Sequence, residues 1–170
     1  MVGRFLLSLL AVSAAARAER SWVFEPDQAL VSVEVRGLSA VSRSLSGSVR
    51  ELDGGAVQVE VRLPLASFVA DRPVPAGAGQ DPEVVFEGAA TRPGKDGVLR
   101  LRGTLSFHGA IRALEFPATL VRAGGMAFSH ATLVLHLRDF GFAVPQGASD
   151  EARVQIDAGL RPEGVLASRG

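Results

Sequence analysis

Apolar and polar side chains alternate along residues 99–116, LRLRGTLSFHGAIRALEF, and this two-residue period constrains the fold more than any other feature of the chain. Successive side chains of a β-strand point to opposite faces, so Leu101, Leu105 and Phe107 fall on one face. The alternation resumes after Gly109, where a turn is expected. The pattern predicts a β-hairpin with one face on a core, and it leaves open whether that core consists of side chains or of a bound ligand.

The same period recurs through most of the chain, and no long segment has the 3.6-residue apolar period of an amphipathic helix. Strands are predicted at residues 30–36, 45–49, 56–65 and 84–89, in the hairpin 99–116, and at 127–137 and 152–160. The irregular segment 70–82, which is rich in proline and glycine, predicts a loop with at most a short helix. The chain is therefore expected to be all-β, with about eight strands. An antiparallel barrel is favoured over an open sheet because closure leaves no unpaired edge strands.

The first 18 residues, MVGRFLLSLLAVSAAARA, have the features of a secretory signal peptide. A basic Arg4 precedes an apolar run at 5–16, and Ala16-Arg17-Ala18 forms an A-x-A cleavage pattern. The apolar run has 12 residues, whereas a membrane-spanning helix needs about 20. We therefore expect cleavage after Ala18 and a periplasmic or secreted protein without a transmembrane anchor. The barrel domain is expected at 19–162, and a disordered tail at 163–170.

Charge and cysteine content exclude several classes of function. The 18 basic residues balance 18 acidic ones, so the clustered positive charge that nucleic-acid binding requires is not expected. The chain has no cysteine, which excludes thiol catalysis, cysteine-ligated metals and a lipid-modified cysteine. The histidines His108, His130 and His136 lack the spacing of a zinc motif, so no metal site and no cofactor are predicted. The sequence leaves the oligomeric state open, and a homodimer is compatible with it.

Catalysis is the less favoured hypothesis. The G-x-S-x-G motif of serine hydrolases does not occur. An enzyme would have to use His108, at the tip of the predicted hairpin, or Asp139, beside Phe140-Gly141, and both are polar residues in predicted turns. We predict no catalytic residue.

The alternating positions define an apolar interior that can be read in two ways. One inward face per strand comprises Val31, Val33, Val35, Val57, Val59, Val61, Val84, Phe86, Leu99, Leu101, Leu105, Phe107, Leu114, Phe116, Leu133 and Leu135. An eight-stranded barrel is either just filled by its side chains or holds one small ligand. Periodicity does not separate a packed core from a tunnel for an extended lipid.

Five segments, in their order along the chain, resemble the YceI-like family. They are residues 21–54, 81–88, 99–116, 138–142 (RDFGF) and 150–157 (DEARVQID). The matching positions in the first three are Trp22, Asp27, Val31, Val33, Val35, Gly47, Val49, Pro82, Val84, Phe86, Leu101, Gly103, Leu105, Phe107, Gly109, Arg112 and Leu114. The match spans essentially the whole chain after the signal peptide.

This resemblance implies a lipocalin-like, extended antiparallel β-barrel, exported in bacteria, that binds a long polyisoprenoid or isoprenoid quinone in an apolar tunnel. The expected lining residues are Val31, Val33, Val35, Val59, Val61, Val84, Phe86, Leu101, Leu105, Phe107, Leu114, Phe116, Leu133, Leu135, Phe140 and Phe142. No catalytic residue, metal or redox cofactor is implied. The alternative is a structural or interaction barrel whose core is filled by side chains and which has no ligand.

The segment 69–83, VADRPVPAGAGQDPE, departs from the family pattern. Family members carry an Arg-Asp-x-His-Leu segment and a short helix here, whereas Asp71 and Arg72 stand in reversed order. We expect the helix to be shortened or lost, which would widen the mouth or change the ligand. Asp71 and Arg72 are the candidates for contact with a polar head group.

Overall fold

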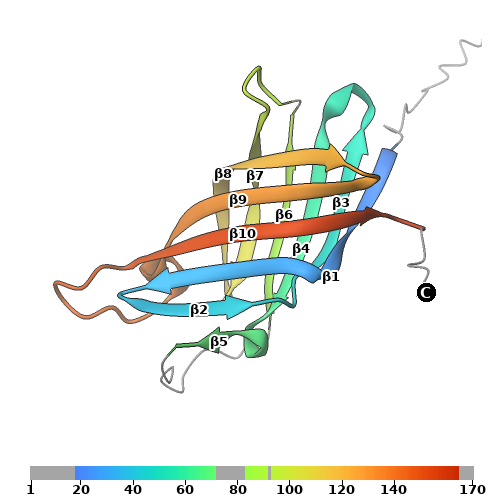
Figure 1. Cartoon of the computed structure of the whole chain (residues 1–170). Coiled ribbons are helices and arrows are strands. Elements are labelled where there is room, and N and C mark those ends of the chain that lie inside the picture. Colours follow the sequence, from blue (N-terminus) through green and yellow to red (C-terminus); the bar gives the residue numbers. More distant parts are fainter. Residues whose placement is uncertain (1–17, 72–82, 92, 165–170) are drawn as a thin grey trace, which may run out of the picture.

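The fold consists of β-strands and short 3-10 helices in the computed structural model, which describes residues 18–71, 83–91 and 93–164. Figure 1 shows their arrangement. The strands are β1 (Ala18–Val35), β2 (Leu38–Ser42), β3 (Ser46–Leu52), β4 (Val57–Pro64), β5 (Val69–Ala70), β6 (Glu83–Ala90), β7 (Val98–Phe107), β8 (Ala110–Ala123), β9 (Met126–His136) and β10 (Glu151–Pro162). The 3-10 helices are η1 (Asp53–Gly55), η2 (Leu65–Ser67) and η3 (Leu137–Phe140).

Eight of these strands form a closed antiparallel barrel. The sheet order is β10-β9-β8-β7-β6-β4-β3-β1-β2-β5, and β10 also pairs with β1, which closes the ring. β2 and β5 lie outside the ring and extend the sheet beside the second half of β1. Closure satisfies the edges that an open sheet would leave unpaired. The predicted all-β fold with about eight barrel strands is confirmed.

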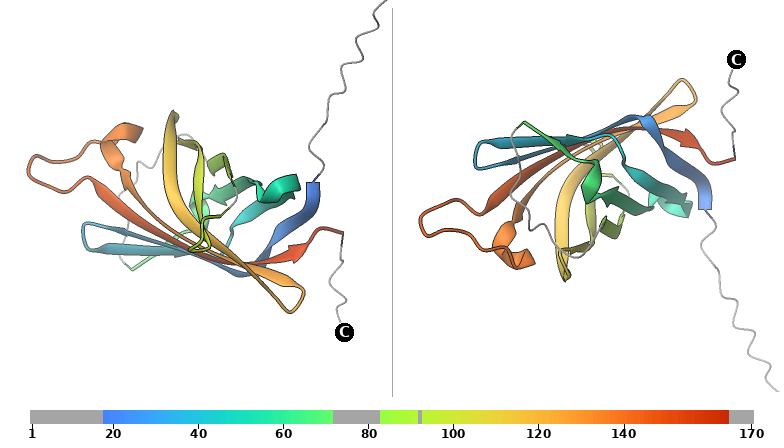
Figure 2. Two further views of the ribbon diagram at one scale, coloured as in Figure 1. Left: turned by 90° about the horizontal axis from the view of Figure 1, so that it is seen from above. Right: turned by 90° about the horizontal axis from the view of Figure 1, so that it is seen from below.

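Two long strands, β1 and β8, form the corners of the barrel. β1 pairs with β3 through its first half and with β2 through its second half, and its register with β10 shifts between Phe24 and Ala29. Pro26, which has no N–H to donate, lies in this irregular stretch. β8 pairs with β7 along 110–119 and with β9 along 118–123. Consequently β9, β10 and the second half of β1 form one curved layer, which the steeper strands β3, β4, β6 and β7 cross (Figures 1 and 2).

The sequence pattern located the strands but not all their ends. The strand predicted at 30–36 is only the second half of β1, because the polar stretch Glu25–Gln28 hides the alternation before it. β2 was not predicted, and the strand predicted at 127–137 ends at His136, where η3 begins. β10 ends at Pro162. The expected tail beyond it falls mostly outside the described residues, as does the predicted signal peptide apart from Ala18.

A pair of glycines allows close packing in the wall between β6 and β7. Gly88 lies opposite Gly103 in the ladder. A Cβ atom on Gly103 would collide with the backbone carbonyl oxygen of Glu87, and a Cβ atom on Gly88 would lie 2.5 Å from Cζ of Phe86. The Phe86 ring therefore lies over Gly88, and it reaches Phe116 with ring centroids 5.1 Å apart. These glycines place an aromatic pair inside the barrel.

Candidate functional site

The barrel encloses an interior cavity of about 1350 Å3. Only four of its lining residues, Arg36, His108, Thr119 and Ser129, carry a polar side chain, and all the others are apolar. Small-molecule sites have volumes of about 300–1,000 Å3 and mostly apolar walls. The interior is therefore not filled by side chains, and it offers room for a large apolar molecule.

The structure places 14 of the 16 predicted lining residues in the wall of this cavity. They are Val31, Val33, Val35, Val59, Val61, Val84, Phe86, Leu101, Leu105, Phe107, Phe116, Leu133, Leu135 and Phe142. Leu114 and Phe140 are not part of the wall. Leu114 lines a second pocket, described below, which shares part of its wall with the cavity. Phe140, in η3, is buried behind the cavity and packs on Phe107 with ring centroids 5.4 Å apart.

Small side chains on β8, β9 and β10 contribute wall that the sequence prediction did not include. Ala118, Ala131 and Ala152 line the cavity from these three strands. Ala118 and Ala131 continue the inward faces predicted for Phe116 and Leu133, whereas no inward face was predicted for the strand that contains Ala152. Their short side chains leave the space that becomes the cavity.

Two hairpin turns bring polar side chains to one end of the cavity, called here the turn end. Arg36 and His108 have φ angles of 49° and 54°, and a glycine with positive φ follows each. This is the pattern of a type I′ hairpin turn, whose first position favours Asn or Gly. Arg36 Nε donates to the carbonyl oxygen of Ser149 at 3.0 Å. His108 contacts the carbonyl oxygen of Phe140. Both turns therefore contact the chain that connects β9 to β10.

The hydrogen bonding of His108 defines its tautomer. Its Nδ1 lies 2.9 Å from the carbonyl oxygen of Phe140, which can only accept, so Nδ1 carries the proton. The imidazole also stacks on Phe142, with ring centroids 4.3 Å apart. In the neutral ring Nε2 remains an acceptor at the turn end.

The opposite end of the barrel carries a polar clasp formed by Trp22, Glu51 and Arg122. Trp22 Nε1 donates to Glu51 Oε1 at 2.6 Å, and Arg122 Nε donates to the same oxygen at 3.0 Å. Arg122 Nη2 donates to Glu51 Oε2, which completes a bidentate pair. Because β3 and β8 lie on opposite sides of the eight-stranded ring, this pair spans the end of the barrel.

The clasp also holds the carboxyl group of Glu51 in its charged form. Burial by itself raises the pKa of Glu51, but hydrogen bonds from Arg122 and Trp22 outweigh it. The charges of Arg122 and Arg20 act in the same direction, and the pKa is below its ordinary value of 4.5. Protonation of Glu51 therefore costs the folded state more than the unfolded state.

We expect Glu51 to contribute stability that is lost in acid. Its pKa is lower in the folded than in the unfolded chain, so the contribution is complete above pH 4.5. It decreases as the pH falls from there through the lower pKa of the folded state. Melting temperatures of the wild type and Glu51→Gln, measured from neutral to strongly acidic pH, should converge towards low pH. Glu115→Gln, which removes an exposed carboxylate, is the control. A difference in melting temperature between the wild type and Glu51→Gln that stays the same at all pH values would contradict this role.

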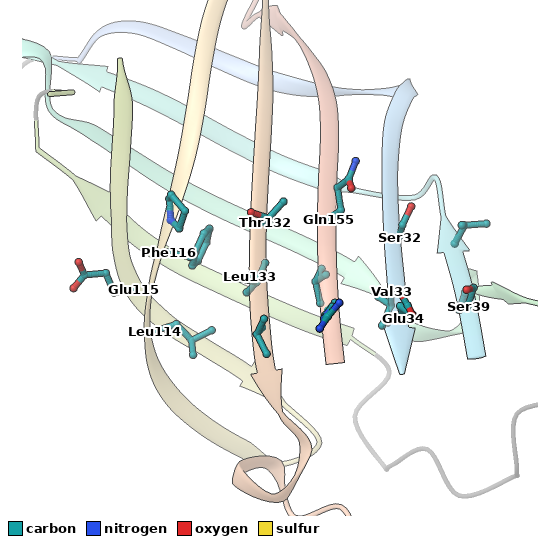
Figure 3. A pocket seen from close by; sticks show the side chains of 16 residues that line it. Ser32, Val33, Glu34, Ser39, Leu114, Glu115, Phe116, Thr132, Leu133 and Gln155 are labelled. Atoms are coloured by element: carbon teal, nitrogen blue, oxygen red, sulfur yellow. The ribbon is translucent and has the colours of Figure 1, made fainter. Parts of the chain in front are cut away.

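A second hollow, the side pocket, lies where β8 and β9 separate (Figure 3). These strands pair only along 118–123 and 126–131. The side pocket has a volume of about 710 Å3 and is lined by residues 32–34, 39–41, 114–117, 132–134 and 153–155. Figure 3 shows Thr132, Gln155 and Ser32 in a row across neighbouring strands. Its lining mixes charged, polar and apolar residues, so the larger interior cavity is the candidate site.

The residues considered for catalysis do not converge. His108 bonds to the backbone of Phe140 rather than to the carboxylate of Asp139. His130 pairs with Asp157 at 2.7 Å, and His136 lies 3.4 Å from Asp150. Across residues 18–71, 83–91 and 93–164 there is no cluster of three or more His, Asp or Glu side chains that could hold a metal.

Two further predictions concern the residues that would contact a polar head group and the expected lack of a transmembrane anchor. Asp71 is exposed and accepts a hydrogen bond from the backbone N–H of Ser39 at 3.2 Å, whereas Arg72 lies outside the described residues. In the part of the chain that the structure describes, no helix has the length and apolar character needed to span a membrane.

The fold and the cavity together define a class of protein, a closed eight-stranded antiparallel β-barrel with an apolar interior space. Comparison with protein families matches the YceI-like domain over residues 22–160. The chain belongs to the YceI-like family.

Two solved structures share the fold at low sequence identity to this chain. BcnA from Burkholderia cenocepacia superposes with a TM-score of 0.71 at 15% identity, covering 80% of this chain and 98% of BcnA. A polyisoprenoid-binding domain from Saccharophagus degradans, implicated in plant cell wall breakdown, superposes with a TM-score of 0.61 at 12% identity. That comparison covers 86% of this chain and 99% of the domain. No curated protein matches the chain.

Proposed function

We propose that this protein is an exported, non-catalytic lipid-binding protein that holds a polyisoprenoid or isoprenoid-quinone chain inside its barrel. The observation that carries the proposal is the cavity of about 1350 Å3 with an almost wholly apolar wall. Membership of the YceI-like family and the polyisoprenoid-binding domain with the same fold support this class of ligand. The predicted signal peptide at 1–18 supports export.

The physical basis of binding would be burial of hydrocarbon. Apolar surface removed from water stabilises a complex by about 25 cal/mol per Å2, before the costs of association are subtracted. A hydrocarbon chain needs no hydrogen-bond partner along its length, and the walls between the two barrel ends supply almost none. The same walls hold no arrangement of acid, base and nucleophile, which favours a carrier over an enzyme.

Lipid that copurifies with the protein tests this proposal directly. The full chain, produced with its own N-terminus in a bacterium that synthesises isoprenoid quinones, is purified from the periplasm. Its organic extract is then examined by mass spectrometry. We expect a polyisoprenoid or isoprenoid quinone in the extract, and an intact protein mass that corresponds to a mature chain starting at Glu19.

A pair of variants on β9 provides the control. Ala131→Phe places a ring in the cavity. Thr132→Phe places the same ring one residue further along, on the exposed outer face of β9. Crowding of this kind costs about 1–3 kcal/mol, so the lipid content of Ala131→Phe should fall by about 10-fold. Thr132→Phe should retain it. An extract without lipid from the wild type, or equal lipid in both variants, would contradict the proposal.

A further inference from the structure

The polar clasp lies one layer beyond the last side chains of the interior cavity. Phe24, Val49 and Leu120 line the cavity from β1, β3 and β8. Residues two apart on a strand point to the same face. Trp22, Glu51 and Arg122 occupy the next inward position on each of these three strands, so the clasp is the layer that follows the cavity wall.

Two of the three clasp side chains are buried at this end of the barrel. Trp22 is 5% exposed, and Leu160 and Ala127, which lie near this end, have no exposed surface. The Glu51 side chain is 9% exposed. Trp22 and Glu51 therefore cover this end of the cavity, and Arg122, whose side chain is 48% exposed, is the clasp residue that meets solvent.

The N–H donors left over in the clasp belong to Arg122, whose side chain is 48% exposed, so the buried part of the clasp offers no spare donor to a polar head group. Both carboxylate oxygens of Glu51 accept from Arg122, and one also accepts from Trp22. Among the described residues no buried polar side-chain atom lacks a partner. A chain pushed further would have to separate Arg122 from Glu51 and leave a carboxylate in apolar surroundings, which is strongly unfavourable.

The turn end brings polar groups to the cavity wall itself. Arg36 forms only one hydrogen bond, through Nε to a backbone carbonyl, and lies within 4 Å of no described carboxylate. His108, whose Nδ1 is bonded to Phe140, presents Nε2 as an acceptor in its neutral form. Of the four polar residues in the cavity wall, Arg36 and His108 lie opposite the clasp, whereas Thr119 and Ser129, which adjoin Leu120, bring only hydroxyl groups to the clasp side.

We infer that the polar clasp is the stop for the bound chain: the apolar tail lies against Trp22, the head group lies at the turn end, and the clasp sets the longest chain that fits. This inference rests on the proposed function. It adds a direction of binding and a residue cluster that determines chain-length specificity.

Trp22 is the only tryptophan of the chain, so its fluorescence reports on the clasp. Bromine quenches indole fluorescence only near contact. We expect a linear primary alcohol brominated at its terminal carbon to quench Trp22, and an alcohol of equal length brominated beside the hydroxyl group to leave it unquenched. Stronger quenching by the second alcohol would overturn the inference, because the head group would then lie at the clasp.

Chain-length specificity is tested with a series of all-trans polyprenols. Each added isoprene unit that fits should raise the affinity by at least about 10-fold, and the increase should stop once the tail reaches the clasp. The polyprenol length at which the affinity stops rising is called the break. In the double variant Glu51→Ala/Arg122→Ala the break should move to a longer polyprenol. The control Arg102→Ala/Glu115→Ala removes an exposed ion pair of 2.9 Å and should leave the break in place.

A second double variant, Glu51→Leu/Arg122→Leu, is used if the alanine variant does not fold. Hydrophobic residues often replace a buried ion pair without loss of stability, so this variant keeps the packing of the barrel end. A break that stays in place in a folded clasp variant would contradict the inference, and so would the absence of any break. Failure of every polyprenol to bind the wild type would instead contradict the proposed function.

Discussion

Replacing Phe140 by alanine should lower the free energy of unfolding by about 3–5 kcal/mol, the cost of deleting a fully buried aromatic side chain. Phe140 is 1% exposed and is among the most deeply buried large side chains of the described residues. Its ring packs on Phe107, and its carbonyl oxygen accepts the hydrogen bond from His108. The substitution removes packing where η3 covers the hairpin of β7 and β8, and it leaves a void that the rigid barrel does not fill.

Chemical denaturation of Phe140→Ala and of Phe128→Ala provides the measurement and its control. Phe128 lies on β9 with 44% of its surface exposed, so its loss should cost less than about 1 kcal/mol. Because Phe140 lies behind the cavity wall, lipid bound per folded molecule should stay close to the wild-type value. Similar losses of stability in the two variants would show that η3 is not packed as described.

Replacing Gly103 by alanine should cost about 2–4 kcal/mol, although it adds a single methyl group. The new Cβ would collide with the carbonyl oxygen of Glu87 and lie 2.5 Å from Cα of Gly88. Both atoms belong to the backbone of β6, so the strands themselves must move apart. That movement breaks ladder hydrogen bonds between β6 and β7 and displaces Phe86 from its place over Gly88.

A glycine in open surroundings is the matched control for Gly103. Gly124 has a φ of 61° in the turn between β8 and β9, and a Cβ there would meet nothing within 4 Å. Asn tolerates this conformation, so Gly124→Asn should change the stability by less than about 0.5 kcal/mol. Thermal unfolding of both variants is the measurement. A stable Gly103→Ala protein would contradict the close contact between β6 and β7.

The faces of the strands could be predicted from the sequence because the two-residue period depends only on the local backbone. It placed Val33, Phe86 and Leu133 on the inner face without knowledge of which strands pair. It did not find β2, since LSAVS contains only two large apolar residues. The same alternation, with Val33 and Val35 inward, puts Arg36 on the outer face, whereas the positive φ of the turn brings this side chain to the cavity.

The polar clasp had no local signal in the sequence. Glu51 and Arg122 are 71 residues apart and lie on strands that are not neighbours, so only closure of the ring brings them together. The open cavity was equally hidden, because alternation gives the direction of a side chain and not the volume between opposite walls. Alanines at inward positions of β8, β9 and β10 were the available sign of unfilled space.

The pairing of β1 with β10 makes the first and last strands of the described residues neighbours. Until β10 is available, β1 and β9 each keep one edge without its partner, and such edges favour aggregation. The last ladder to form joins residues more than one hundred positions apart, as in Val31↔Ile156, and long-range pairing of this kind folds slowly. The ring therefore closes only after β10 has been synthesised, and the barrel depends on this one strand to cover the open edges of both β1 and β9.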